Sequence, residues 1–242
     1  MKNFNKKIIT SILTFFIIIL LSISIILANN LGDESYFKIN KDKIYYEIKH
    51  FDNEIISMAN LLNNIENKSD FYINWEELEE NTYSLYSYWN SVILDLNFLN
   101  INKEDLIDFG KDLDELTISI KYKNKHKTLS NLIELYNKLT IYLESMNSNN
   151  YKNIVTTKLN LLCAYYIAEK GNWTLAHEYI LEASESIYKV VNLTEINQYS
   201  QYNINQAYVA VKEMENLINI KDMNVFYFKY TIAINNLINL TI

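Results

Sequence analysis

Side chains that could take part in nucleophilic or metal chemistry are few and scattered in this chain. It has three histidines, His50, His126 and His177, and a single cysteine, Cys163. A zinc site gathers several such ligands, and an internal disulfide needs two cysteines. Cys163 lies within an apolar run, so we expect a small core residue rather than a reactive thiol.

One histidine has the spacing of a metal-binding motif. Glu47 and His50 form a Glu-x-x-His pair, which is half of the ligand set of a carboxylate-bridged di-metal site. The other half would be a second such pair, but no glutamate stands three residues before His126 or His177. A solvated surface pair is the ordinary interpretation, and we predict no metal and no cofactor.

Two groups of acids could bind cations or a basic peptide. They are Glu76, Glu77, Glu79 and Glu80, and Asp105, Asp108, Asp112 and Glu115. The second group has the spacing i, i+3, i+7, i+10, which places its carboxylates on one helix face. Acids near a helix N-terminus are also stabilised by the helix dipole without any ligand, which is the simpler interpretation.

The chain contains no recognisable catalytic motif. With three glycines and no proline, it has no Gly-x-Ser-x-Gly, no His-Glu-x-x-His and no glycine-rich phosphate loop. We therefore predict no catalytic residue and no enzymatic activity. All 22 basic residues are lysines and the net charge is −7, which argues against nucleic-acid binding because arginine is the usual ligand of phosphate and guanine.

Aromatic residues are abundant, with 20 tyrosines, 10 phenylalanines and 3 tryptophans. Tyr83 and Tyr86 lie off the apolar stripe of their predicted helix, so we expect them to be exposed. Exposed aromatic side chains suit contacts with proteins or sugars. Together with Tyr179 they are the predicted partner-binding residues.

The N-terminal segment has the length of a membrane span. Residues 8–28 carry no charge, and 21 helical residues cover the roughly 30 Å hydrocarbon core. Lysines precede the segment, so the positive-inside rule predicts a cytoplasmic tail (1–7), a signal anchor (8–28), a linker (29–40) and an extracytoplasmic domain (41–242). The alternative is a cleaved signal peptide and a secreted domain. The anchor is favoured because the apolar run exceeds the usual signal length and bulky Ile26 occupies the −3 position.

The rest of the chain predicts an all-α fold. The lack of proline and the scarcity of glycine disfavour the many tight turns of a sheet protein. Apolar residues recur at helical spacing over about eight segments, namely 44–65, 75–96, 106–120, 129–143, 151–170, 176–190, 204–218 and 226–240. The predicted N-caps are Asn74, Asn102, Asn172 and Thr194. Short connections predict antiparallel hairpins, arranged as a bundle or as a short open solenoid.

A weak repeat supports stacked hairpins. Lys127, Trp173 and Lys221 stand near the predicted starts of three helices at similar intervals. Within residues 160–183 the best local match combines a Gly-Asn-Trp turn with small packing residues, namely Ala164, Gly171, Asn172, Trp173, Ala176, Ile180 and Ala183. This segment resembles one tetratricopeptide repeat, although it lacks the closing proline and has Ile167 where an aromatic is common. The turn also resembles uncharacterised membrane-anchored helical proteins of low-G+C bacteria, a resemblance that implies no activity.

The sequence therefore predicts a non-enzymatic, membrane-anchored helical domain that makes protein–protein contacts outside the cytoplasm. The alternative is an extracytoplasmic domain that senses or carries a small molecule in a pocket between helices.

Overall fold

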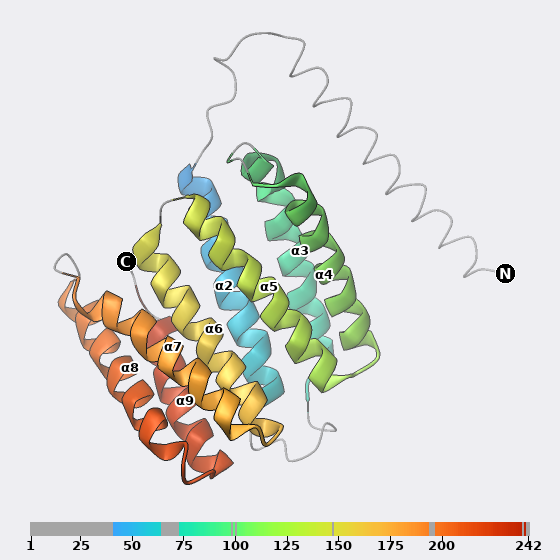
Figure 1. Cartoon of the computed structure of the whole chain (residues 1–242). Helices are drawn as coiled ribbons and strands as arrows, with labels where there is room; N and C mark the ends of the chain where they lie inside the picture. The colour runs from blue at the N-terminus through green and yellow to red at the C-terminus, as the bar shows by residue number, and fades with distance from the viewer. Residues whose placement is uncertain are drawn as a thin grey trace, which may run out of the picture. The chain divides into compact units, whose positions relative to one another are not determined.

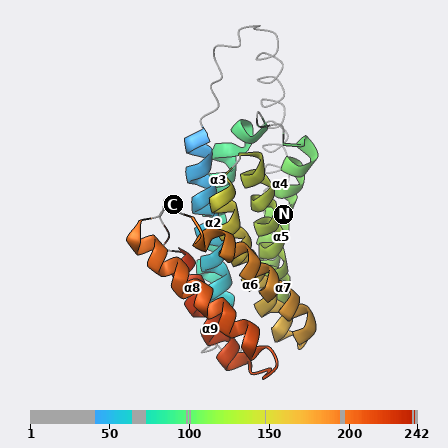
Figure 2. The same ribbon diagram turned by 60° about the vertical axis from the view of Figure 1, so that its left-hand side comes forward.

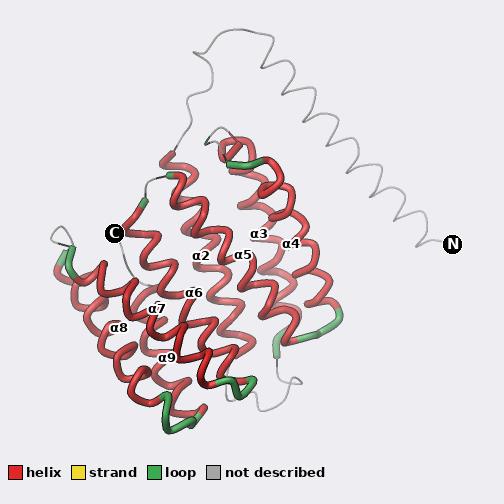
Figure 3. The backbone as a smooth tube through the Cα atoms, viewed as in Figure 1, coloured by secondary structure: helices red, strands yellow, loops and turns green. Residues whose placement is uncertain are grey.

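The computed structural model describes residues 41–63, 73–97, 99, 101–146, 148–193, 197–238 and 240. These residues form helices and connecting loops with no strand among them, which confirms the predicted all-α class for this part of the chain (Figure 3). The helices are α2 (Lys41–Asn63), α3 (Trp75–Asn97), α4 (Lys103–Lys121), α5 (Lys125–Ser145), α6 (Asn149–Glu169), α7 (Trp173–Val191), α8 (Gln198–Leu217) and α9 (Met223–Ile238) (Figure 1).

The chain divides into two units, Met1–Ile39 and Asn40–Ile242, and all eight of these helices belong to the second. The predicted tail, spanning segment and linker (1–7, 8–28 and 29–40) lie outside the described residues. Within the described residues, no helix combines the length and apolar character needed to cross a membrane.

Asparagine side chains start several helices as predicted. Asn74 accepts a hydrogen bond from the Glu77 N–H, and Asn102 and Asn172 cap α4 and α7 in the same manner. Two helix starts differ from the predicted ones by a few residues. Helix α8 begins at Gln198, where the Asn197 side chain accepts a hydrogen bond from the Ser200 N–H, and the predicted cap Thr194 lies outside the described residues. Helix α5 begins at Lys125, ahead of Lys127, because Asn124 caps it.

The N-cap residues of the helices recur at a regular spacing, although few side chains are shared between the hairpins. The second helix of each hairpin starts at an Asn or Asp whose side chain accepts from the backbone, at positions 74, 124, 172 and 222. Successive caps therefore lie 48 to 50 residues apart. The four hairpins α2–α3, α4–α5, α6–α7 and α8–α9 are thus structural copies of similar length.

The hairpins close into two four-helix bundles. Each helix packs on its neighbours in sequence, and in addition α2 packs on α5 and α6 packs on α9. These two contacts close α2–α5 and α6–α9 into rings, whereas an open solenoid would lack them. In both ribbon views α3 and α4 lie on one side, α8 and α9 on the other, and α2, α5 and α6 between (Figures 1 and 2).

Aromatic side chains fill the centre of the first bundle. Each of its four helices contributes one ring, from Phe51, Trp89, Phe109 and Tyr142. The ring centroid of Phe109 lies 5.3 Å from that of Phe51, 4.2 Å from that of Trp89 and 5.7 Å from that of Tyr142. All four are nearly inaccessible to solvent, so burial of large apolar surface holds this ring of helices together.

Small residues let α6 and α7 pack closely. Ala164, Ala176 and Ala183 are fully buried, as expected from the local resemblance. Gly171 turns the chain between the helices with a φ of 81°, a left-handed conformation that glycine adopts without steric cost. The Asn172 N–H then donates to the Ile167 carbonyl at 3.2 Å, which closes the turn.

Candidate binding site

A groove lies on α6 between α5 and α7. Helices α5 and α7 pack on either side of α6 (Figure 1). The volume of the groove is about 300 Å³. The lining residues are Ile133, Glu134 and Asn137 from α5, Leu159, Asn160 and Cys163 from α6, and Tyr179 and Glu182 from α7. Three helices of the two bundles thus converge on one concave surface.

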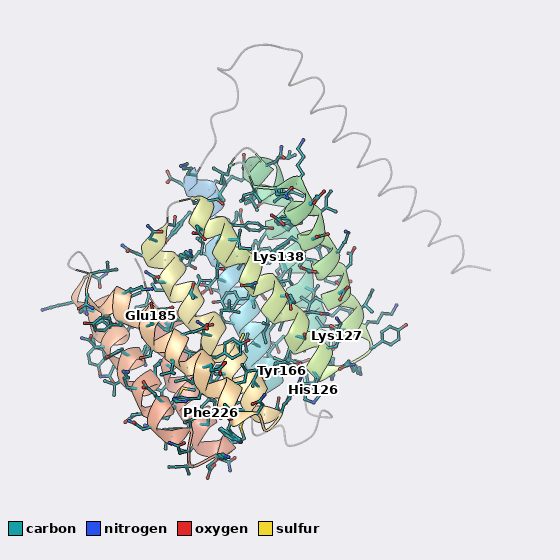
Figure 4. All side chains as sticks on the ribbon, viewed as in Figure 1. His126, Lys127, Lys138, Tyr166, Glu185 and Phe226 are labelled. Carbon is teal, nitrogen blue, oxygen red and sulfur yellow. The ribbon has the colours of Figure 1, made fainter. Side chains whose placement is uncertain are left out.

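The floor of the groove belongs to a helix that is buried on almost all sides. Helix α6 is buried along nearly its whole length, because it contacts α5, α7 and α9 and also hydrogen-bonds to α2. Near its C-terminal end, Lys125 pairs with Glu169 at 2.7 Å and the Tyr166 hydroxyl donates to the His126 carbonyl at 3.3 Å (Figure 4). These contacts join α5 to α6 beyond the groove.

The polar side chains of the groove lack a partner among the described residues, and three of them, Glu134, Asn137 and Glu182, belong to exposed residues. Within the part of the chain that the structure describes, no side-chain hydrogen bond or ion pair is made by Glu134, Asn137, Asn160, Tyr179 or Glu182. Asn160 is the most telling of them, because its residue is only 6% exposed. Its amide atoms are not among the fully buried, unpartnered atoms of the described residues, so they open onto the groove, where water or a ligand can form hydrogen bonds with them.

The acids of the α4 face differ from the groove acids, because most of them are paired with lysines. On the acidic face of α4, Asp112 pairs with Lys138 at 2.5 Å and Glu115 with Lys127 at 2.9 Å, both across the interface with α5 (Figure 4). Asp108 pairs with Lys111 at 2.7 Å on α4 itself. The α4 face singled out by its spacing is therefore largely neutralised by lysines, whereas no lysine lines the groove.

Cys163 lines the groove, and its thiol stays protonated at neutral pH. Burial, followed by the charges of Glu182 and Glu134, raises the pKa of its thiol to about 12. At neutral pH the sulfur is therefore a thiol, and a nucleophilic role has no support. The same causes act on Tyr179, whose pKa is raised by burial first and then by Cys163 and Glu182.

The structure does not gather the three predicted partner-binding tyrosines. Tyr83 lies on α3 and is 67% exposed, as expected from its place off the stripe. Tyr86 is only half-exposed, because its hydroxyl donates to Asp114 at 2.5 Å and accepts from Thr117 at 3.3 Å. Tyr179 lies on α7, in the other bundle, where it lines the groove.

Sequence reasoning missed a buried charge cluster where the bundles meet. The carboxylate of Asp52, on α2, accepts hydrogen bonds from the hydroxyls of Tyr136 and Tyr151 and forms an ion pair with Lys158. Both charged side chains are 1% exposed. Burial lowers the pKa of Lys158 and raises that of Tyr136 and Tyr151. A signal existed, since Asp52 stands at helical spacing from Ile48 and Ile55 on the apolar face.

This cluster is sealed in the core and fully paired, so it organises the fold rather than a ligand. The histidine of the Glu-x-x-His pair also has an ordinary setting, because the His50 ring lies 4.3 Å from Tyr46 and 5.3 Å from Tyr88. Among the described residues, no three His, Cys, Asp or Glu side chains are grouped so that they could hold a metal ion.

Comparison with known proteins gives little further guidance. No family model and no solved structure matches the chain. The chain is 28% identical over 171 residues to the phenylalanine–tRNA ligase beta subunit of Mycoplasma mycoides subsp. mycoides SC. This match covers 61% of the chain but only 20% of the ligase subunit, so the chain spans about a fifth of that relative's length. Such a partial likeness does not assign the chain to a family.

Proposed function

We propose that this chain is a non-catalytic binding protein that recognises a protein partner through the groove between α5, α6 and α7. The observation that carries the proposal is the set of five polar side chains, from three helices, that converge on the groove without a partner. Binding sites combine an apolar floor with a few convergent polar groups. Ile133 and Leu159 supply the apolar part here, and the amides, carboxylates and Tyr179 supply the polar part.

The size of the groove favours one side chain of a partner as the occupant. A volume of about 300 Å³ lies at the lower end of the range for pockets that hold small molecules. A protein partner can insert one anchor residue there and make its remaining contacts on the surrounding surface. A small ligand that fills the same volume is the second candidate, which would make the chain a sensor or carrier.

The proposed location follows from the N-terminal segment. Residues 8–28 would anchor the chain in the cytoplasmic membrane and present residues 41–242 on the outer side. Protease added to intact cells should then digest the helical domain, whereas it should leave the domain untouched if the domain is cytoplasmic. Loss of the N-terminal segment from the mature protein, read by mass spectrometry, would favour the cleaved form.

Photo-crosslinking tests the groove directly. A photoreactive phenylalanine analogue replaces Tyr179 in the groove or, in a matched variant, exposed Tyr83 on α3. In cells that make the full chain, we expect one specific adduct from position 179, which disappears when the bulky ring of Asn160→Trp obstructs the groove. Adducts from position 83 and none from position 179 would contradict the proposal and move the partner surface to the first bundle.

A further inference from the structure

The charge and hydrogen-bonding groups of the groove define the chemical class of its occupant. We propose that the groove binds an organic ammonium or guanidinium cation, which is the head group of a lysine or arginine side chain and of small amines. This inference rests on the function proposed above, because it names what the groove recognises.

The charges of the groove have one sign. Glu134 lies on the α5 wall and Glu182 on the α7 wall, and no lysine is among the lining residues. Neither carboxylate forms an ion pair within the described residues, whereas ten such pairs occur elsewhere in them. A cation between the two walls would be attracted by both acids, but a phosphate or carboxylate ligand would find no positive group.

The hydrogen-bonding groups fit the same occupant. An ammonium group has three donors and no acceptor, and a guanidinium has five donors and no acceptor. Asn160 supplies an amide oxygen from a residue that is only 6% exposed, and Asn137, Tyr179 and the two carboxylates supply further acceptors. This amide belongs to a residue that is more than nine-tenths buried and has no side-chain partner among the described residues, an observation independent of the acids, and its polar atoms open onto the groove, where a ligand can form hydrogen bonds with them.

The apolar lining fits the rest of such a ligand. Lysine and arginine side chains, like alkylamines, carry a methylene stem that packs on apolar surface while the charged end reaches polar groups. Ile133, Leu159 and the uncharged thiol of Cys163 provide that surface. The groove therefore offers an apolar stretch and an acidic, acceptor-rich stretch within about 300 Å³.

Cys163 makes the test specific, because it is the only cysteine of the chain and lines the groove. Three methanethiosulfonate reagents of similar size are compared on the full chain: aminoethyl (cationic), sulfonatoethyl (anionic) and neutral methyl. Each forms a mixed disulfide with the thiol and releases methanesulfinate, and intact mass gives the rate. After division by the rates with a free thiol, we expect the cationic reagent to react at least about tenfold faster than the anionic one.

Matched variants show whether a faster reaction of the cationic reagent comes from the groove acids or from the overall negative charge of the protein. Glu134→Gln with Glu182→Gln should bring the rate ratio of cationic to anionic reagent close to one. Glu144→Gln with Glu185→Gln removes two carboxylates from the same helices, but these pair with Lys152 and Lys189 outside the groove, so the ratio should stay high. Asn160→Trp should slow all three reagents, because its bulky ring obstructs the floor of the groove.

Protection distinguishes the two sources of the cation. If small amines are ligands, n-butylammonium should slow labelling of Cys163 more than sodium ions do at equal ionic strength. If only a lysine side chain within a peptide binds, a capped lysine peptide should protect and n-butylammonium should not. Protection by neither overturns the inference.

The remaining outcomes separate the inference from the proposed function. Fast labelling by the neutral reagent, with no preference for the cation, would overturn the inference and leave the groove as a binding site for another class of ligand. Labelling of unfolded but not folded protein by all three reagents would show a closed groove and overturn both.

Discussion

At the scale of single residues, the domain holds charged side chains in two different settings, a buried ion pair and an open groove. Asp52 and Lys158 are sealed in the core, where each charge is compensated by the other and by tyrosine hydroxyls. Glu134 and Glu182 line an open groove and have no protein partner. The first arrangement stabilises one packing of the helices, because a buried charge is tolerated only where it is paired. The second leaves charge available to a ligand.

The core pair makes a sharp stability prediction. Asp52→Ala leaves the Lys158 ammonium buried without compensation, so we expect the free energy of unfolding to fall by about 3 to 5 kcal/mol. Urea unfolding followed by circular dichroism measures the change. Glu185→Ala, which breaks an exposed pair with Lys189, is the control and should cost at most about 0.5 kcal/mol.

A double variant tells charge compensation from lost packing. Asp52→Leu with Lys158→Met removes both charges, so it should be more stable than Lys158→Met alone, which leaves an uncompensated carboxylate. If the double variant loses the sum of the two single losses, the two side chains act independently and the ion pair does not organise the junction.

At the scale of elements, two glycines should respond in opposite directions. Gly171→Ala forces a φ of 81° on a residue with a Cβ, so the free energy of unfolding should fall by about 1 kcal/mol or more. Gly110 lies within α4 and a Cβ there meets no atom within 4 Å, so Gly110→Ala should raise it by about 0.5 to 1 kcal/mol. Thermal melts of both variants check the signs, and equal losses would contradict the assigned turn geometry.

The helices themselves could be predicted from sequence because apolar spacing and asparagine caps are local signals. The observed starts of α8 and α5 differ from the predicted ones by a few residues, since several polar residues near a boundary can cap and only the backbone geometry selects one. The closure of the bundles could not be predicted, because it depends on contacts between α2 and α5 and between α6 and α9, far apart in sequence. The groove was missed for the same reason, although Tyr179 was singled out.

At the scale of the whole domain, buried tyrosines make the stability of the fold depend on pH in the alkaline range. Burial raises the pKa of Tyr136, Tyr142, Tyr151, Tyr165 and Tyr230 above the ordinary value of 10. Above pH 10 an unfolded chain loses these protons while the fold keeps them. The stability that they contribute is therefore complete below pH 10 and is lost as the pH rises.

Alkaline unfolding measures this effect. The pKa of Lys158 is lowered from 10.5, so its titration makes the free energy of unfolding rise with pH only below pH 10.5. Above pH 10.5 the tyrosines dominate, and the free energy of unfolding should fall by about 1.4 kcal/mol per pH unit for each of them. Urea unfolding at several values between pH 10.5 and 12 gives the slope, and Tyr136→Phe should reduce it by one tyrosine. A free energy independent of pH in this range would show that these hydroxyls titrate in the folded state.

Thermal stability in the presence of an amine tests most directly whether the domain is built to bind a cation in its groove. The melting temperature of the full chain is followed against n-butylammonium chloride, with sodium chloride at equal ionic strength as the reference. Binding at ten times the Kd should raise it by about 3 to 6 °C. We predict this rise for the unaltered chain and for Glu144→Gln with Glu185→Gln, and its loss in Glu134→Gln with Glu182→Gln. No rise above the sodium chloride reference with either n-butylammonium or a capped lysine peptide, or a rise that survives the removal of Glu134 and Glu182, would contradict the account.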